Sequence, residues 1–434
     1  MTTPPSSPLP SSPSQGSRGQ AAGARTAETR FPEIRTEVLV VGGGLAGLTL
    51  ATALASAGVP VVCVDRDDPG RHLDAGFDGR TTALAHASRN VLEGAGVWRH
   101  LAADAGPILD IRVADANAPL FLHYDHRDVG LGPFGYIVEN TVIRRALFAR
   151  AGELEGLVHL TGTGVAALER TATRAVATLA DGRRVAARLI VGADGQGSFC
   201  RRSAGIPVMS WRYDQTAIVC NIAHEKPHRG IAVEHFLPTG PFAVLPMTGN
   251  RSSIVWSERS DRVPIYMRLD DTAFAAELER RAGPWLGRVT PITGRWTWPL
   301  GVMHAERYVD RRLALVGESA HAIHPIAGQS LNMGLRDVAA LAEVVVDAHR
   351  LGLDVGDPAG LERYQRWRRF DNLTLVAVTD GLTRLFSNDI APVRLARDLG
   401  MAAVNRMAPL KRFFMRHAMG MVGDLPRLIR GEPL

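Results

Sequence analysis

The sequence predicts an α/β fold: a mostly parallel sheet flanked by helices, interrupted by a second, antiparallel sheet and followed by a helical C-terminal region. A strand, a glycine-rich turn, a helix and another strand follow one another within residues 37–65, which is the size of a βαβ unit. Residues 188–194 and 312–317 are apolar runs typical of parallel strands buried on both faces. Residues 111–127 and 211–260 instead alternate like antiparallel strands.

The chain begins with a segment that is rich in proline, serine and glycine, residues 1–35, and we predict a disordered tail there. It lacks the apolar core of a secretory signal. The first strand follows at 37–42, the helix at 48–57 closes at Gly58, and the second strand runs over 59–64.

Beyond this unit, the pattern predicts a loop leading into a helix over 75–98 and a helix over 140–151. Residues 165–189 are typical of a hairpin around an Asp-Gly turn. A long helix is expected over 331–351, and everything after Pro358 has helical character.

Composition excludes several classes of protein. Of 434 residues, 46% are hydrophobic and 22% are charged, so the chain can bury a large core. The net charge of +6 is too mild, and the sequence too poor in basic blocks, for a nucleic-acid partner. Three cysteines without a CxxC pair exclude a disulfide framework and thiolate metal sites. No apolar run reaches 18 residues, so no membrane-spanning helix is expected.

The turn after the first strand carries a dinucleotide-binding pattern. Gly42 permits the tight turn, Gly44 lets a pyrophosphate approach the backbone, and Gly47 allows close packing of helix on strand. Asp65 stands 23 residues after Gly42 at a strand end, where an acid can bind ribose hydroxyls. An acid there favours NAD or FAD over NADP.

Two later segments have patterns typical of the segments with which flavin enzymes bind the rest of the cofactor. Residues 191–201 are a strand that ends in Gly-Ala-Asp-Gly, and residues 313–334 are a strand, a Gly-acid pair and a loop that leads into a helix. A flavin therefore fits the sequence better than a nicotinamide.

These three segments together resemble the FAD-dependent aromatic-ring monooxygenases of the para-hydroxybenzoate hydroxylase type, over residues 36–351. Further motifs resemble the ubiquinone-biosynthesis hydroxylase branch of that family; they lie at 78–84, 135–140, 240–246, 364–369 and 379–386. The resemblance implies a Rossmann-like FAD-binding domain of three-layer ββα type and covers nearly the whole chain beyond the tail.

The resemblance also implies which residues hold FAD. They are the glycine-rich turn, the acid and its neighbour after the second strand, two arginines, the Asp-Gly segment, and the Gly-acid segment with its loop: Gly42, Gly44, Leu45, Ala46, Gly47, Asp65, Arg66, Arg80, Arg144, Asp194, Gly317, Glu318, Pro325, Gly328, Gln329 and Asn332. Two residues depart from the pattern: the family usually has Asp where Glu318 stands and Gly where Ser330 stands. Either change could weaken FAD retention.

By the same resemblance, the chain is a monooxygenase that hydroxylates the ring of a polyprenylated phenol in ubiquinone biosynthesis. The reaction uses O₂ and proceeds through a C4a-hydroperoxyflavin, with electrons from NAD(P)H or a redox partner. No residue declares itself as a catalytic acid or base. The ring carbon that is hydroxylated, the prenyl length, the electron donor and the oligomeric state are left open.

Several alternatives stay open beside this reading. They are a monooxygenase of another aromatic substrate, a flavin-dependent isoprenoid reductase, and a non-catalytic assembly subunit that keeps FAD. Trp296 and Trp298 suggest a flavin halogenase, but that chemistry needs a lysine near the cofactor, and Lys226 and Lys411 are the only lysines. His321 and His324 do not predict a metal site, because no carboxylate or cysteine stands at ligand spacing.

The domain division expected is a discontinuous FAD-binding domain over 36–110, 135–205 and 300–357, and a substrate-binding sheet domain over 111–134 and 206–299. The C-terminal helical region takes 358–434. Within it, residues 401–434 carry six basic and two acidic residues among apolar ones, which predicts docking on an anionic membrane surface. The expected location is cytoplasmic, peripheral at the inner face of the membrane, with other ubiquinone-biosynthesis proteins as candidate partners.

Overall fold

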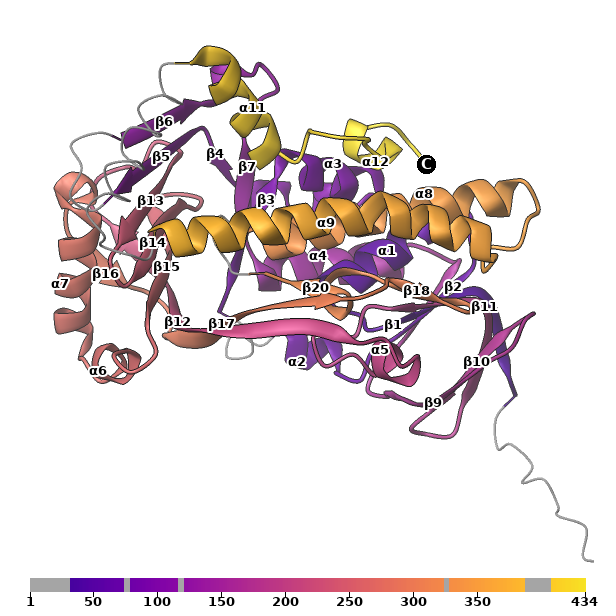
Figure 1. Ribbon diagram of the computed structural model, residues 1–434. Coiled ribbons are helices and arrows are strands. Elements are labelled where there is room, and N and C mark those ends of the chain that lie inside the picture. Colours follow the sequence, from indigo (N-terminus) through magenta and orange to yellow (C-terminus); the bar gives the residue numbers. More distant parts are fainter. Residues whose placement is uncertain (1–31, 74–78, 116–120, 324–327, 387–406) are drawn as a thin grey trace, which may run out of the picture.

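The computed structural model describes residues 32–73, 79–115, 121–323, 328–386 and 407–434 (Figure 1). They form two large sheets, a small third sheet and a set of helices, which are packed side by side in one elongated molecule. The predicted α/β class is confirmed.

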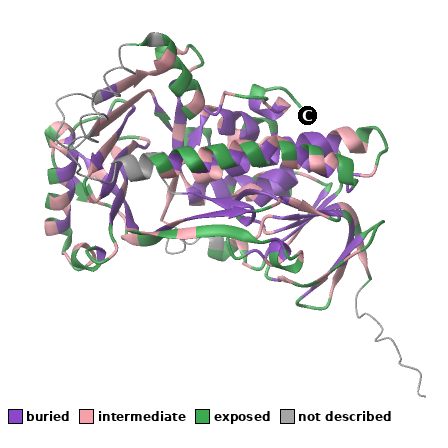
Figure 2. Ribbon diagram, in the orientation of Figure 1, coloured by how far each residue is buried: buried purple, intermediate pink, exposed green. Residues whose placement is uncertain are grey.

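The first sheet has eight strands and a parallel centre. Its path is β18 (Val309–Asp310), β19 (Leu313–Leu315), β11 (Arg184–Gly192), β1 (Ile34–Val41), β2 (Val61–Val64) and β8 (Leu157–Leu160), and the antiparallel strands β10 (Ala175–Leu179) and β9 (Val165–Arg170) extend from β11. β1 pairs in parallel with both β11 and β2. The helices α1 (Leu45–Ser56), α4 (Asn140–Gly152) and α8 (Gln329–Arg350) bury this sheet (Figure 2).

The second sheet has nine strands and is almost wholly antiparallel. Its path is β20 (His321–Ala322), β17 (Trp296–Ala305), β12 (Val208–His224), β15 (Arg251–Arg259), β14 (Gly240–Pro246), β13 (Ile231–Leu237), β5 (Asp110–Asp115) and β6 (Phe121–Asp125), with β16 (Val289–Pro291) beside β12. Only β5 and β13 pair in parallel. One face packs Trp256 and Phe242 into a core with α6 (Val263–Met267) and with Phe274 of α7 (Asp271–Ala282).

The prediction of a loop at the start of residues 75–98 is wrong in part. Thr81–Ala85 forms a strand, β3, which precedes helix α3 (His86–Gly94). β3 pairs with β7 (Gly135–Glu139), which also pairs with β4 (Gly106–Ile108), in a three-stranded sheet between the two large ones. A five-residue strand without alternation gives no periodic signal, and its pairing partner lies more than fifty residues away in the chain.

The C-terminal part is helical where the structure describes it. α9 (Pro358–Phe386) runs beside α8, and α11 (Ala408–Ala418) and α12 (Arg427–Arg430) follow (Figure 1). None of the helices in the described ranges is long and apolar enough to cross a membrane.

A buried carboxylate ties α9 to the parallel sheet. Asp337 Oδ1 accepts hydrogen bonds from Arg368 Nε at 2.8 Å and Asn372 Nδ2 at 3.0 Å, while Oδ2 accepts from Gly317 N at 3.1 Å and pairs with His321 Nε2 at 2.5 Å. Burial alone would raise the pKa of Asp337, but the charges and hydrogen bonds of His321 and Arg368 outweigh it and hold that pKa well below its usual range. Asp337 thus fixes the turn at Gly317 against two helices.

Candidate functional site

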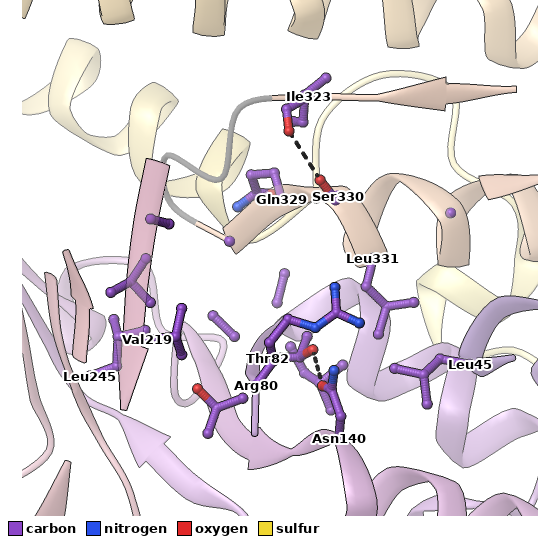
Figure 3. A pocket seen from close by; sticks show the side chains of 18 of the residues that line it. Leu45, Arg80, Thr82, Asn140, Val219, Leu245, Ile323, Gln329, Ser330 and Leu331 are labelled. Carbon is purple, nitrogen blue, oxygen red and sulfur yellow. Dashed lines mark hydrogen bonds between the residues drawn. The ribbon is translucent and has the colours of Figure 1, made fainter. Parts of the chain in front are cut away.

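A cavity of about 520 Å³ lies between the carboxyl ends of the parallel strands and one face of the second sheet (Figure 3). Residues that follow β1, β11 and β19 line one end: Gly44, Ala193 and Val316. The start of α8 lines another side, and the sheet face lines the rest. This is the edge of an α/β sheet at which ligands bind.

The three motif glycines occupy distinct positions around the turn after β1. Gly42 has a φ of +105°, and a Cβ there would lie 2.4 Å from Ala193 O. A Cβ on Gly47 would lie 1.9 Å from Gly42 O. At Gly44, by contrast, a Cβ would meet nothing within 4 Å, because Gly44 faces the cavity with Leu45 and Ala46. Two glycines therefore close the turn, and the third leaves room for a ligand.

Asp65 and Arg66 follow β2, as the sequence predicts, but neither lines the cavity. Asp65 is 7% exposed, and its Oδ1 accepts a hydrogen bond from Asp67 N at 3.0 Å. The Arg66 side chain points to solvent and lies 3.9 Å from an Asp67 carboxylate oxygen. A role for either in holding the adenosine end of a dinucleotide stays a prediction.

The two predicted arginines both line the cavity. Arg80 precedes β3 and extends into the cavity below the start of α8, while its guanidinium lies 4.4 Å from the centroid of the Trp298 ring (Figure 3). Arg144 lies on α4 and is 8% exposed. Together they bring positive charge to the cavity wall.

The predicted Asp-Gly segment contributes its backbone more than its acid. Ala193 and Gly195 line the cavity, whereas Asp194 Oδ2 accepts a hydrogen bond from Cys200 N at 3.0 Å. Asp194 Oδ1 is buried and has no hydrogen-bond partner among the described residues. Because Asp194 itself is not among the residues that line the cavity, its contact to a cofactor stays a prediction.

The Gly-acid segment and the loop after it meet at the cavity. Gly317, Gly328 and Gln329 line it together with Glu318, whose exposed side chain makes no hydrogen bond within the described part of the chain. Pro325 lies outside the described residues. Ser330 points its hydroxyl back toward Ile323 O at 3.4 Å (Figure 3).

Asn332 has a different position from the one that the sequence suggests. Its Oδ1 accepts hydrogen bonds from Ala85 N and Ser88 Oγ, at 2.9 and 2.7 Å, and its Nδ2 donates to Ala83 O and Gly328 O, at 2.8 and 3.1 Å. The side chain is 3% exposed and does not line the cavity. It fixes the start of α8 against β3, and a direct cofactor contact stays a prediction.

Two uncapped helix ends make the cavity suitable for FAD. Neither α1 nor α8 has a side-chain hydrogen bond at its N-cap, Gly44 or Gly328, and the first residues of both helices line the cavity. Such ends present N–H groups and positive potential to anions. The first suits a pyrophosphate, and the second suits the negative charge that a reduced flavin carries at its pyrimidine end. The residues present therefore fit the cofactor.

The sheet face opposite the cofactor loop is built from small side chains. Ala243, Val255 and Val219 lie side by side on β14, β15 and β12, and Ser257 lies beside Ala217 on the next row. These residues leave space where larger ones would fill it, and Figure 3 shows Val219 and Leu245 across the cavity from Gln329 and Ser330.

Sequence reasoning missed two other groups at the site. Thr82 Oγ1 donates to Asn140 Oδ1 at 2.7 Å on the cavity wall. Glu234, on β13, also lines the cavity. An isolated Glu in an alternating strand gives no signal, because such a residue normally faces solvent. No group of three or more His, Cys, Asp or Glu in the described ranges could hold a metal ion, and His321 pairs with Asp337.

Comparison with known proteins adds independent findings. The FAD binding domain family matches residues 35–370. The chain is 56% identical over 401 residues to ubiquinone hydroxylase UbiL of Rhodospirillum rubrum, covering 92% of this chain and 93% of the relative. It is 35% identical over 389 residues to 3-demethoxyubiquinol 3-hydroxylase of Escherichia coli, covering 89% and 99%.

Solved structures show the same fold at lower identity. p-Nitrophenol 4-monooxygenase PnpA from Pseudomonas putida superimposes with a TM-score of 0.75 at 17% identity, covering 89% of this chain and 99% of that one. The Diels-Alderase PyrE3 superimposes with a TM-score of 0.70 at 24% identity, covering 90% and 82%. At these identities the likeness shows the fold alone, and one fold supports more than one chemistry.

Proposed function

We propose a function from the premise that this chain belongs to the ubiquinone-biosynthesis hydroxylase family of FAD-dependent aromatic-ring monooxygenases. It hydroxylates the aromatic ring of a polyprenylated phenol in ubiquinone biosynthesis, with O₂ as the source of the oxygen atom. One observation supports this best: a single cavity joins the glycine-rich turn, which suits a dinucleotide, to a sheet face of small apolar residues, which suits a ring.

Bound FAD supplies the reduced flavin that activates O₂, and the chain supplies binding, orientation and exclusion of water. The N-terminus of α1 would hold the pyrophosphate, and Arg80 and Arg144 would add positive charge to the same cavity. The N–H groups at the start of α8 would stabilise the negative charge of a reduced flavin. Ala243, Val255 and Val219 accept the substrate ring, and their apolar surface keeps water from the reacting atoms.

In our proposal, the chain divides these tasks between the ranges expected from the sequence, although β17 and β20 of the second sheet reach into the range 300–357. Residues 36–110, 135–205 and 300–357 bind FAD, and residues 111–134 and 206–299 bind substrate. Electrons come from NAD(P)H or from a redox partner, and other ubiquinone-biosynthesis proteins are candidate partners.

Purified protein with photoreduced FAD, mixed with O₂ and a short-chain 2-prenylphenol, tests the reaction. We expect a product with one added oxygen atom and O₂ consumption that depends on the phenol. An isoprenoid reductase would instead saturate a double bond without using O₂. In a deletion strain, mass analysis of the accumulating quinone intermediate identifies the ring position.

The helix α11 supports a further proposal, that the protein docks on an anionic membrane surface where its lipid-like substrate resides. Phe413 and Phe414 are 51% and 42% exposed, and Arg412 and Arg416 are exposed beside them, while Met415 and Met419 are buried against the body. An amphipathic helix with exposed aromatic and basic residues suits such an interface.

The rest of the segment 401–434 is less suited to this role. Residues 401–406 lie outside the described ranges, and Leu428 and Ile429 of α12 are buried in the core of the first sheet. The proposal therefore narrows to α11.

Vesicle flotation tests the membrane proposal. Wild-type protein should float with anionic vesicles at low salt and less so at high salt. The double variant Phe413→Ser/Phe414→Ser should be absent from the floating vesicle fraction. The matched control, Phe370→Ser, removes a phenylalanine that is 76% exposed on α9 and should float like wild type. Equal flotation of all three proteins would contradict a role for α11.

A further inference from the structure

Glu234 lies on the cavity face of the second sheet. Its neighbour Val233 packs into the opposite core with Trp256 and Phe242, and side chains alternate along a strand, so Glu234 points the other way. In register with it across the sheet stand Ala243 and then Val255, which both line the cavity. The carboxylate thus opens into the part of the cavity that suits a substrate ring.

The carboxylate has no hydrogen bond or ion pair with any described residue, although it is half-buried. A carboxylate withdrawn from water without a partner costs free energy, so a protein that keeps one in a cavity gains nothing in stability from it. An unpaired acceptor in a substrate cavity is instead available to a group on the ligand.

The other ionisable groups near Glu234 line the same cavity or lie on the flanking strands and on α11. The charged residues that share its cavity are Arg144 on α4, Glu318 after β19, and Arg80, whose guanidinium lies over the Trp298 ring on β17. On the flanking β5, Asp110 pairs with His123 at 3.2 Å, and β14 has no ionisable residue. α11 packs near Ala232 and carries Lys411, Arg412, Arg416 and His417, of which Lys411 pairs with Asp128 at 3.0 Å.

We propose that Glu234 is the catalytic base that takes the proton from the phenol hydroxyl of the substrate, an inference that rests on the proposed function. The O–H bond of the phenol breaks, its electron pair stays on the oxygen, and a new O–H bond forms on the carboxylate. Nothing is oxidised or reduced in this step. The phenoxide then directs electron density to the ring carbon that receives the oxygen atom. When aromaticity returns, the ring C–H proton leaves to solvent and Glu234 gives its proton back to the phenoxide oxygen.

The surroundings of Glu234 give its carboxyl a pKa that suits a general base. Burial raises the pKa of Glu234 to about 7, and a general base works best when its pKa lies near the working pH. Below pH 7 the carboxyl is protonated and cannot accept the proton, so the base is active above this pH. An ordinary glutamate with a pKa near 4.3 would be a weaker base for a phenol.

The substitution Glu234→Gln tests the proposal, because it keeps the size and removes the base. Reduced holoenzyme is mixed with O₂ and a short-chain 2-prenylphenol, and hydroxylated product is measured between pH 5.5 and 9. We expect wild-type product formation to rise through about pH 7. The variant should be slower by on the order of 100-fold and lose this pH dependence. Glu155→Gln, on an exposed loop, should behave like wild type.

Two readouts without turnover separate chemistry from folding. Glu234→Gln should retain FAD and unfold at the same or a higher temperature than wild type at pH 8, since it removes an unpaired, half-buried carboxylate. Binding of the phenol should shift its ultraviolet absorbance toward that of a hydrogen-bonded phenol in wild type and less in the variant. Product formation by Glu234→Gln within three-fold of wild type, with the same pH profile, overturns the inference. A wild type that hydroxylates no phenol overturns the proposed function as well.

Discussion

Replacing Asp337 by Asn should destabilise the protein more than the same change in a partly exposed ion pair. Asp337 is fully buried, and its main partner, Arg368, is 2% exposed, so loss of the carboxylate leaves a buried charge with less compensation. Breaking a buried pair in this way costs about 3–5 kcal/mol. Asp310 offers the matched control, because it pairs with Arg170 at 2.7 Å with a side chain that is 32% exposed. Solvent lowers the contribution of a partly exposed pair toward the value of about 0–1 kcal/mol that exposed pairs have.

Urea unfolding of the FAD-loaded protein, followed by tryptophan fluorescence, measures both costs through the shift in midpoint. The pH dependence supplies a second check. Because the pKa of Asp337 is lowered in the folded state, its contribution is present above the unfolded pKa of about 3.9 and is lost as the pH falls below it. The difference between wild type and Asp337→Asn should therefore shrink in acid. Equal midpoint shifts for Asp337→Asn and Asp310→Asn would refute the reasoning.

Two further predictions concern the cofactor. Gly44→Val should fold but lose FAD, because a side chain there has open space in the protein and would occupy the place of the pyrophosphate. The ratio of flavin to protein absorbance measures the loss of FAD. A yellow variant with full FAD content would contradict this prediction. Gly47→Ala is the comparison, since its Cβ would lie 1.9 Å from Gly42 O and should lower the yield of folded protein itself. Gly328→Trp should keep the adenine end of FAD bound yet disable hydroxylation. Gly328 has a φ of +61° at the start of α8, and a Cβ there would lie 3.1 Å from Ala83 Cβ. Full product formation by this variant would show that the loop does not face the flavin.

The sequence predicts best what is local in the chain. The turn at Gly42, Gly44 and Gly47 follows from backbone sterics within six residues, and the structure gives each glycine the space that its predicted role needs. The long helix α8 and the hairpin at Gly182 follow from periodicity and turn chemistry in the same way.

What the sequence does not show depends on contacts between distant segments. Asp337 meets Arg368 and His321 only after α8 and α9 have packed, and none of the three has a distinctive local pattern. Glu234 is unusual only because the strands beside it present small residues to a cavity. The resemblance assigns Asn332 to the cofactor. In the structure, its side chain makes four hydrogen bonds to protein groups, which lie in β3, in α3 and at the N-cap of α8.

The position of α11 has a consequence for how a substrate with a long hydrocarbon tail is handled. Ala418 of this helix lines the cavity, whereas Phe414, one turn earlier, faces outward. One helical turn rises about 5.4 Å, so an outward-facing residue and a cavity-lining residue lie about one turn apart on the same helix. Withdrawing a tail from lipid into water costs about 0.8 kcal/mol per methylene, which is prohibitive for many isoprene units. If α11 docks on the bilayer as proposed, the ring needs to travel only a short way inward while the tail remains in the lipid, and the substrate need not leave the lipid whole.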